Sequence, residues 1–221
     1  MDRMEVMRAC HSVRSFTDRQ VVPAAAQALR DALDEANREQ GLHMQLILDE
    51  PSAFSGPLAH YGKFHNVKNY IALVGPKNAQ RSIGCGGEQA VLLAQSLGLN
   101  TCWVAMTCRR GKVPCTVETG EKLHCVVALG YGTTQGVSHP VKPIEQLCRV
   151  DGAMPEWFRR GMEAAQLAPT AMNQQKFLFT LEGTDTVRAK ALAGPYTQID
   201  LGIAMCHFAL GAGAEGWRWA D

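Results

Sequence analysis

The sequence has no long apolar run, almost no net charge and few aromatic residues. No hydrophobic stretch approaches the ~20 residues that a membrane-spanning helix needs, and 22 basic against 21 acidic residues leave a formal net charge of +1. Aromatic residues make up 7% of the 221 residues, although hydrophobic residues reach 46%. This composition is typical of a globular protein and argues against a membrane protein or a nucleic-acid-binding protein with a strong positive field.

Patterns for metal ligation and for nucleophilic catalysis are missing as well. The seven histidines form no HxxxH or HExxH pattern, the eight cysteines contain no CxxC pair, and no GxSxG elbow is present. We therefore expect no metal site and reduced thiols. The first residues lack the apolar core of a secretory signal, so we expect a cytoplasmic protein.

The hydrophobic pattern alternates between helical and extended segments. After a short N-terminal helix that ends in the turn 12–16, it predicts helices over 24–39, 86–97, 155–167 and, capped by Asp200, 201–210. Short β-favouring runs predict strands at 44–48, 69–75, 101–105, 123–129 and 177–181. The glycines of segment 84–87 favour a turn before their helix. This order indicates a mixed α+β protein.

Two pairs of segments are similar in pattern. Residues 25–50 and 157–182 both predict a helix followed by a strand, and 86–103 and 200–217 both combine an apolar helix with a later tryptophan. An internal duplication is one explanation. The other is that any α+β protein shows such an order by chance, and few identities decide between them.

Two polar segments are candidates for ligand binding. His11-Ser12-Val13-Arg14 places a hydroxyl beside a permanently charged guanidinium, which suits a phosphate or the polar edge of a heterocycle. In the segment 168–176, APTAMNQQK, amides follow a proline that ends a helix, and amides suit a ring with alternating N–H and C=O groups. Alternatively, the first segment is a solvated helix end, and the second binds only its own backbone.

Taken together, CHSVRSF, APTAMNQQKF and GLNTCW resemble the flavin-dependent nitroreductase family. Members typically carry R-[RH]-S-x-[RK]-x-[FY] near the start and an A-P-S-x-x-N-x-Q-P-W loop. The resemblance implies an α+β fold with a central, mainly antiparallel sheet flanked by helices. It also implies an FMN site at the interface of an intertwined homodimer, and an enzyme that takes a hydride from NAD(P)H and reduces a small electron-poor acceptor such as a nitroaromatic or quinone.

The resemblance also implies which residues contact FMN. They are His11, Ser12 and Arg14 at the phosphate, ribityl chain or pyrimidine edge; Thr170, Asn173 and Gln175 near the isoalloxazine ring; the backbone of Trp103, Val104 and Ala105 near flavin N5; and Lys142 at the phosphate. No side chain is expected to be catalytic, because the chemistry takes place on flavin N5.

The sequence departs from the family pattern in three places. Cys10 replaces the first arginine, and Lys176-Phe177 replaces the Pro-Trp pair. The amide loop usually follows soon after the basic motif, but the segment 37–43, NREQGLH, contains no such loop. The motif lies instead in the last third of this chain.

This displacement suggests that a duplicated chain carries both walls of one site. We expect a first repeat over 1–150 with the basic motif and a degenerate second repeat over 151–221 with the amide loop, forming one compact unit. One chain then completes a site alone, with a homodimer still possible. The alternative functions are a non-catalytic FMN-binding protein, such as a flavin store or sensor, and an interaction domain without a cofactor.

Overall fold

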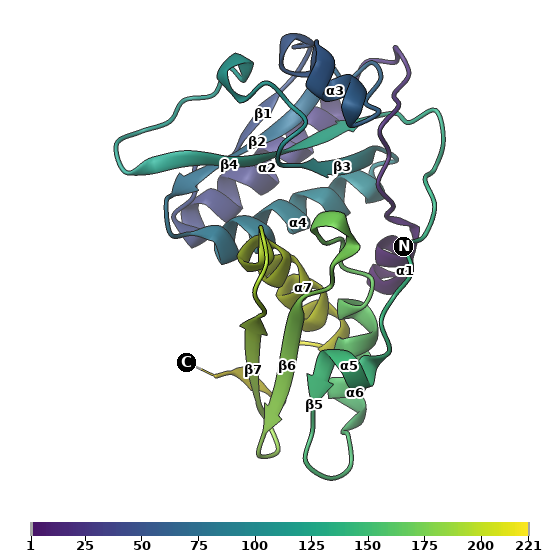
Figure 1. Ribbon diagram of the computed structural model, residues 1–221, viewed down its shortest axis with the longest axis vertical. Coiled ribbons are helices and arrows are strands. Elements are labelled where there is room, and N and C mark those ends of the chain that lie inside the picture. Colours follow the sequence, from purple (N-terminus) through teal and green to yellow (C-terminus); the bar gives the residue numbers. More distant parts are fainter. Residues whose placement is uncertain (1, 221) are drawn as a thin grey trace.

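The computed structural model, which describes residues 2–220, contains two four-stranded sheets with helices between them (Figure 1). The larger sheet, ordered β1-β2-β4-β3, is entirely antiparallel and consists of β1 (Gln45–Ile47), β2 (Asn69–Pro76), β3 (Asn100–Val104) and β4 (Glu121–Gly130). The smaller sheet is ordered β5-β6-β7-β8 and consists of β5 (Cys148–Arg149), β6 (Phe177–Glu182), β7 (Thr186–Ala191) and β8 (Arg218–Trp219). The predicted α+β class with an antiparallel sheet flanked by helices is confirmed.

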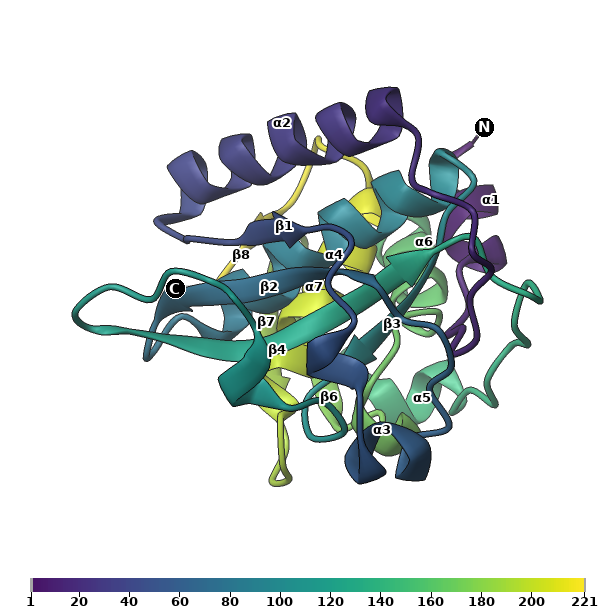
Figure 2. The same ribbon diagram turned by 90° about the horizontal axis from the view of Figure 1, so that it is seen from above.

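The helices separate the two sheets. They are α1 (Arg3–Ala9), α2 (Pro23–Gln40), α3 (Pro57–Tyr61), α4 (Gln80–Ser96), α5 (Ile144–Leu147), α6 (Glu156–Ala165) and α7 (Thr197–Ala212), with 3-10 turns at Ser52–Phe54, Arg110–Lys112 and Ala171–Asn173. α2 and α4 cover one face of the larger sheet, and α7 runs beneath α4 toward the smaller sheet (Figure 2). α5 and β5 precede residue 151 but pack with the smaller sheet.

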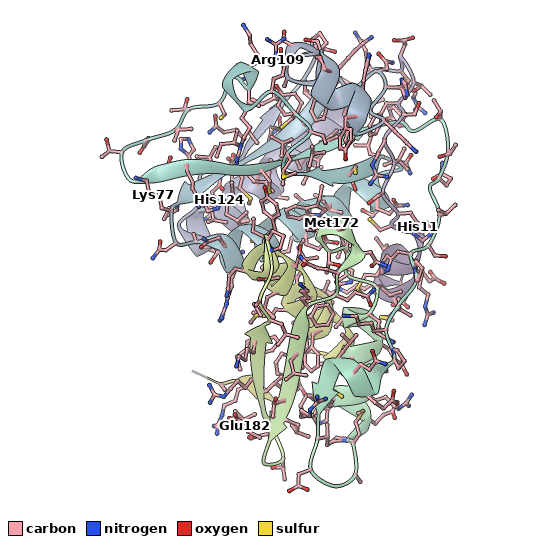
Figure 3. All side chains as sticks on the ribbon, viewed as in Figure 1. His11, Lys77, Arg109, His124, Met172 and Glu182 are labelled. Carbon is pink, nitrogen blue, oxygen red and sulfur yellow. The ribbon has the colours of Figure 1, made fainter. Side chains whose placement is uncertain are left out.

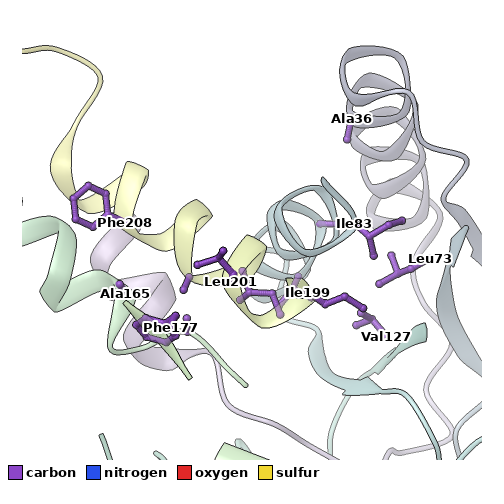
Figure 4. Packing of buried hydrophobic residues seen from close by; sticks show 14 of the residues in the cluster. Ala36, Leu73, Ile83, Val127, Ala165, Phe177, Ile199, Leu201 and Phe208 are labelled. Carbon is purple, nitrogen blue, oxygen red and sulfur yellow. The ribbon is translucent and has the colours of Figure 1, made fainter. Parts of the chain in front are cut away.

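One apolar cluster joins both parts of the molecule. It includes Leu73 and Val127 from the larger sheet, Ile83 from α4, Ile199 from α7 and Phe177 from the smaller sheet (Figure 4). All five are buried. Because a single core runs through both sheets, neither part buries its apolar face without the other.

One group of aromatic residues lies at the far end of this core. The ring of Phe208 stacks on Phe179 with centroids 4.9 Å apart, and it contacts Phe158, Trp217 and Trp219 edge-on or tilted. Edge-to-face and offset aromatic pairs add about 0.5–1.5 kcal/mol each to their area burial. These contacts therefore stabilise the packing of α7 against the smaller sheet.

α4 and α7 approach each other so closely that only glycine fits at the crossing. A Cβ on Gly84 would lie 2.2 Å from the carbonyl oxygen of Ile199, and one on Gly202 would lie 2.1 Å from that of Arg81. The turn expected at 84–87 is therefore wrong. These residues lie inside α4, and the absence of side chains serves the helix contact.

Three other local expectations differ from the structure. α7 begins at Thr197, so Asp200 lies in its first turn and does not cap it. The segment around residues 12–16 is extended, because it forms bridges to Thr101, His65 and Gly132. β7 and β8 were not predicted, because β7 alternates buried and exposed positions with charged residues and β8 has only two residues.

Candidate functional site

The N-terminal basic segment runs as an extended chain beside β3. Ser12 bridges to Thr101, and the backbone N–H of Val13 donates to the carbonyl of Thr101 at 2.9 Å. Side chains of an extended chain alternate between two faces, so Val13 is buried while Ser12 and Arg14 are exposed on the opposite face. The same alternation that anchors the segment therefore turns its polar groups outward.

The guanidinium of Arg14 is available to a ligand. It lies 6.0 Å from the centre of the Phe64 ring and forms no ion pair with any residue in the range 2–220. β3 is the edge strand of the larger sheet, and its outer edge is bridged by this segment at Thr101. Trp103, Val104 and the following Ala105 continue that edge toward the amide loop.

The amide loop, residues 169–175, is held in a strained backbone conformation. Met172, Asn173 and Gln175 have φ values of 54°, 51° and 46°, which L-residues adopt at a cost of about 1–3 kcal/mol each. Asp200 of α7 offsets part of this cost, because its carboxylate accepts from the backbone N–H of Ala171 at 3.0 Å and from Gln174 at 2.8 Å. The loop shape is thus imposed by α7.

The amide side chains of this loop bind the neighbouring backbone. Nε2 of Gln175 donates to the Pro140 carbonyl at 2.9 Å, and its Oε1 accepts from the backbone N–H of Lys142 at 2.7 Å. Asn173 also donates to Pro140 at 2.9 Å, and Nζ of Lys142 donates to the carbonyls of Gln174 and Gln175 at 2.9 and 3.1 Å. These groups fasten the loop to segment 140–142.

A cavity of about 380 Å³, the central pocket, lies between the basic segment, β3 and the amide loop. Its lining residues are Ser12, Arg14, Cys102, Trp103, Val104, Ala105, Met106, Cys125, Pro169, Thr170, Ala171, Met172, Pro195, Tyr196, Ile199, Asp200 and Ile203. Met172 stands where the amide loop meets the larger sheet (Figure 3). The walls are mostly apolar and carry a few polar groups, as is usual for a small-molecule site.

The central pocket brings together most of the residues predicted from sequence. Ser12, Arg14, Trp103, Val104, Ala105 and Thr170 line it. His11, Lys142, Asn173 and Gln175 do not. His11 lies near α1 (Figure 3), packed against Gly136, and the other three belong to the hydrogen-bond network just described.

Several lining residues carry no sequence signal. Ile199 and Ile203 read as ordinary helix core, and Tyr196 and Pro195 precede α7 without any motif. Met106 and Met172 are different, because they are 69% and 80% exposed although they are large and apolar. The sequence does not predict that these two methionines are exposed at one cavity, because their segments come together only in the folded chain.

A buried hydrogen-bonded pair, Glu88 and His207, supports the β3 wall from behind. Nε1 of Trp103 donates to Glu88 at 3.0 Å, and Glu88 accepts from Nε2 of His207 at 2.8 Å. The other ring nitrogen of His207 faces the carbonyl of Ala164 at 3.1 Å. Both ring nitrogens of His207 are therefore hydrogen-bonded. Glu88 and His207 are 0% and 1% exposed, so the pair is fully desolvated.

Burial also affects two titratable groups of the central pocket. It raises the pKa of the Asp200 carboxyl, against the lowering effect of the hydrogen bonds from Ala171 and Gln174. It likewise raises the pKa of the Cys102 thiol, although Arg14 and Ser12 act in the opposite direction.

Among residues 2–220 no three His, Cys, Asp or Glu side chains form a group that could hold a metal ion. None of the helices in that range has the length and apolar character required to cross a bilayer.

Known structures share this fold. A nitroreductase structure from Thermotoga maritima, described as "putative", aligns with a TM-score of 0.69 and 22% identity over 96% of this chain and 83% of its own. A "putative nitroreductase in complex with FMN" from Desulfovibrio desulfuricans aligns with a TM-score of 0.52 and 18% identity over 69% and 98%. A "Putative NADH dehydrogenase/NAD(P)H nitroreductase" from Parabacteroides distasonis gives 0.52 and 18% over 66% and 95%.

A sequence comparison identifies the family. No curated protein matches the chain. The family model described as "Putative TM nitroreductase" matches residues 2–212, which include the basic segment, β3, the amide loop and α7. This match covers nearly the whole chain and every wall of the central pocket, and so the protein belongs to this nitroreductase family.

Proposed function

We propose that the protein is an FMN-dependent oxidoreductase that oxidises NAD(P)H and reduces an electron-poor acceptor of the nitroaromatic or quinone type. One observation carries the proposal. A single cavity gathers Ser12 and Arg14 of the basic segment, the Trp103–Ala105 edge of β3 and Thr170 of the amide loop. The family membership and the FMN named for the Desulfovibrio structure support the choice of cofactor.

The residues of the central pocket fit such a group. A flavin has a broad apolar ring with one polar edge, and the pocket pairs apolar walls with the cation of Arg14, which no acidic residue among 2–220 neutralises by an ion pair. The carboxylate of Asp200 also lines the cavity, but its hydrogen bonds to Ala171 and Gln174 direct it toward the loop. The volume of about 380 Å³ falls within the usual range for small-molecule sites.

Each part of the pocket then has a role in holding the cofactor. Bound FMN would supply the two-electron chemistry, which no side chain here provides. Arg14 would bind the polar edge of the ring and stabilise negative charge there, and the β3 edge near Ala105 would orient the ring through backbone amides. Thr170 would contact the ring from the opposite wall. His11, Lys142, Asn173 and Gln175 would complete the site, the last three by fixing the loop.

We also propose that one chain completes one site, as the product of an internal duplication. If the short helix α3 is left out, the order α2, β1, β2, α4, β3 has its counterpart in α6, β6, β7, α7, β8. The crossing of α4 and α7 is reciprocal, since each glycine approaches the carbonyl of the residue three positions before the other. Such reciprocity is what a twofold axis produces. The repeats would then span about 1–150 and 151–221.

A visible absorption spectrum of the purified protein tests the cofactor. We expect the flavin band, a ratio near one FMN per chain, and bleaching of the band on addition of NADH or NADPH under anaerobic conditions. A coloured protein that neither nucleotide bleaches would instead be a non-catalytic FMN store or sensor. A colourless protein that does not take up added FMN would overturn the proposal.

A mixing experiment tests the single-chain site. Arg14→Glu and Ala171→Trp alter opposite walls of the central pocket, and each variant alone should bind FMN poorly. If each chain builds its own site, a mixture of the two variants binds no more FMN than the variants do separately. Recovery of tight binding in the mixture would show that walls are shared between chains. Retention of FMN on dilution is the matching observation for the wild-type protein.

A further inference from the structure

A second cavity of about 280 Å³, the basic pocket, adjoins the central pocket. It is lined by Gln80, Arg110, Lys122, Leu123, His124, Gly194, Tyr196, Thr197, Gln198 and Ile199. Tyr196 and Ile199 also line the central pocket, so the two cavities share a wall at the start of α7. His124 marks the basic pocket on β4, above the segment that leads into α7 (Figure 3).

The charges of the basic pocket are all of one sign. Arg110 and Lys122 are its charged residues, and none of its lining residues is acidic. The guanidinium of Arg110 is fixed in place, because its Nη2 donates to the backbone carbonyls of Leu123 and His124. The ammonium of Lys122 has no hydrogen-bond or ion-pair partner within residues 2–220. One cation is therefore held in position and the other remains available to a ligand.

His124 adds a polar group without adding charge. Its Nε2 donates to the Pro76 carbonyl at 2.9 Å. Burial lowers the pKa of His124, and the nearby cations of Lys122 and Arg110 lower it further. Hydrogen bonds to the carbonyls of Pro76 and Gly75 act in the opposite direction, but the net pKa is lowered, so the imidazole is neutral at physiological pH.

We propose that the basic pocket binds the phosphate groups of the reduced nicotinamide dinucleotide while the nicotinamide ring reaches the adjacent central pocket. This inference rests on the proposed function. Phosphate is the ligand class that two cations and no acid favour. Nitroaromatic and quinone acceptors carry no phosphate, whereas a dinucleotide carries a pyrophosphate. The resemblance places His11, Ser12 and Arg14 at the phosphate, ribityl chain or pyrimidine edge of FMN. None of the three lines the basic pocket, so its cations remain for a second anion.

A phosphate-free donor separates this role from the flavin chemistry. We compare NADH with an N-alkyl dihydronicotinamide, which carries the same reactive ring but no phosphate, using a neutral quinone as acceptor. In Lys122→Gln the ratio of kcat/KM for NADH to that for the phosphate-free donor should fall about fivefold, as expected for one partly exposed charge contact. Lys122→Glu should lower the ratio further, and added salt should reduce it in the wild-type protein.

Lys77→Gln is the matched control. Lys77 directly follows β2 (Figure 3), is exposed and does not line the basic pocket, and its substitution changes the net charge equally. The ratio should stay at the wild-type value in this variant. An equal fall in both lysine variants, or no fall in Lys122→Glu, would overturn the proposal, since neither is expected of a local phosphate contact.

A direct titration separates failure of this inference from failure of the proposed function. Inorganic pyrophosphate is titrated into FMN-free protein and monitored by amide NMR shifts, which do not depend on flavin chemistry. Shifts at Lys122, His124 and Thr197 that weaken in Lys122→Gln support the basic pocket. Their absence overturns it even if the protein is a working flavin enzyme. Conversely, pyrophosphate binding in a protein that takes up no FMN would contradict only the proposed function.

Discussion

The two walls of the central pocket use their polar groups in opposite ways. On the first wall, Ser12 and Arg14 project from an extended chain and have no ion-pair partner among the described residues. On the second wall, the amides of Asn173 and Gln175 are hydrogen-bonded to Pro140, and Asp200 is hydrogen-bonded to the loop itself. The first wall can therefore bind a ligand through a charged side chain, whereas the polar groups of the second wall hold the loop in the conformation that forms the cavity.

This difference separates binding from positioning. Groups that a protein has already hydrogen-bonded to itself contribute little extra binding energy, because a ligand must displace an existing partner. Unpaired groups on a rigid backbone contribute more. Substitutions on the first wall should therefore change ligand affinity, and substitutions on the second wall should change stability first.

We expect the largest change in stability from substitution of Glu88, which holds Trp103 of the first wall from behind. Glu88→Ala removes the hydrogen-bond partner of the buried His207 and of the Trp103 indole, and each buried group left without a partner costs about 1–3 kcal/mol of unfolding free energy. Urea denaturation followed by circular dichroism measures it. Gln89→Ala, at the exposed neighbouring position of α4, should change stability little. Equal stabilities for the two variants would contradict a structural role for the pair.

Arg14→Glu should weaken FMN binding with little loss of stability. Reversing the charge beside an anionic ligand removes an attractive contact, which costs about 2–5 kcal/mol for a desolvated pair. Quenching of flavin fluorescence on titration gives the affinity, and thermal unfolding checks the fold. Arg109→Glu reverses an exposed charge outside the central pocket and is the control. Wild-type FMN affinity in a folded Arg14→Glu protein would place Arg14 outside the site.

Gln175→Ala should show the reverse pattern. The side chain is 4% exposed, and its loss leaves the backbone N–H of Lys142 without its acceptor, so the unfolding free energy should fall by about 1–3 kcal/mol. Gln20→Ala, at an exposed position, is the control for denaturation. A large loss of FMN affinity at unchanged stability would instead show that this amide acts on the ring.

The smallest effect concerns Asp200 and depends on pH. Burial raises the pKa of this carboxyl above its ordinary value of 3.8, so the folded protein binds the proton more tightly than the unfolded chain. The contribution of Asp200 to stability should therefore fall as pH rises from about 4 through the folded pKa, by about 1.4 kcal/mol for each pH unit over which only the folded protein keeps the proton. In Asp200→Asn this fall is absent, so the stability difference between variant and wild type should move in favour of the variant between about pH 4 and pH 7. A difference independent of pH would contradict the raised pKa.

The residue types of the first wall were accessible to sequence analysis because their signal is local. Ser12 and Arg14 stand two residues apart, but the segment was predicted as a turn, and the extended conformation that turns both outward depends on its bridges. The strand that carries Trp103 and Val104 was also predicted, because it is short and rich in β-favouring residues. Both the residue types and the strand prediction depend only on neighbours in the chain.

The second wall was less accessible because its features depend on tertiary contacts. The partners of Gln175 come from segment 140–142, and the role of Asp200 depends on where α7 begins. An aspartate before an apolar run resembles a helix cap, but Tyr196, with φ of 61°, starts the helix earlier. Similarly, the sequence around Gly84 predicts a turn, because the close packing of α7 that requires a glycine there is a tertiary contact.

The close crossing of α4 and α7 also sets how ligands can enter and leave. Backbone atoms meet at Gly84 and Gly202, so neither helix can slide or roll across the other without losing that contact. The amide loop is hydrogen-bonded to α7 through Asp200, so we expect the gap between the two walls to change little. Exchange then depends on the exposed side chains of Met106 and Met172 at the cavity. Unbranched, flexible side chains of this kind change rotamer within picoseconds to nanoseconds. Access to the cavity would thus be controlled by fast side-chain motion and not by the slow opening of two domains.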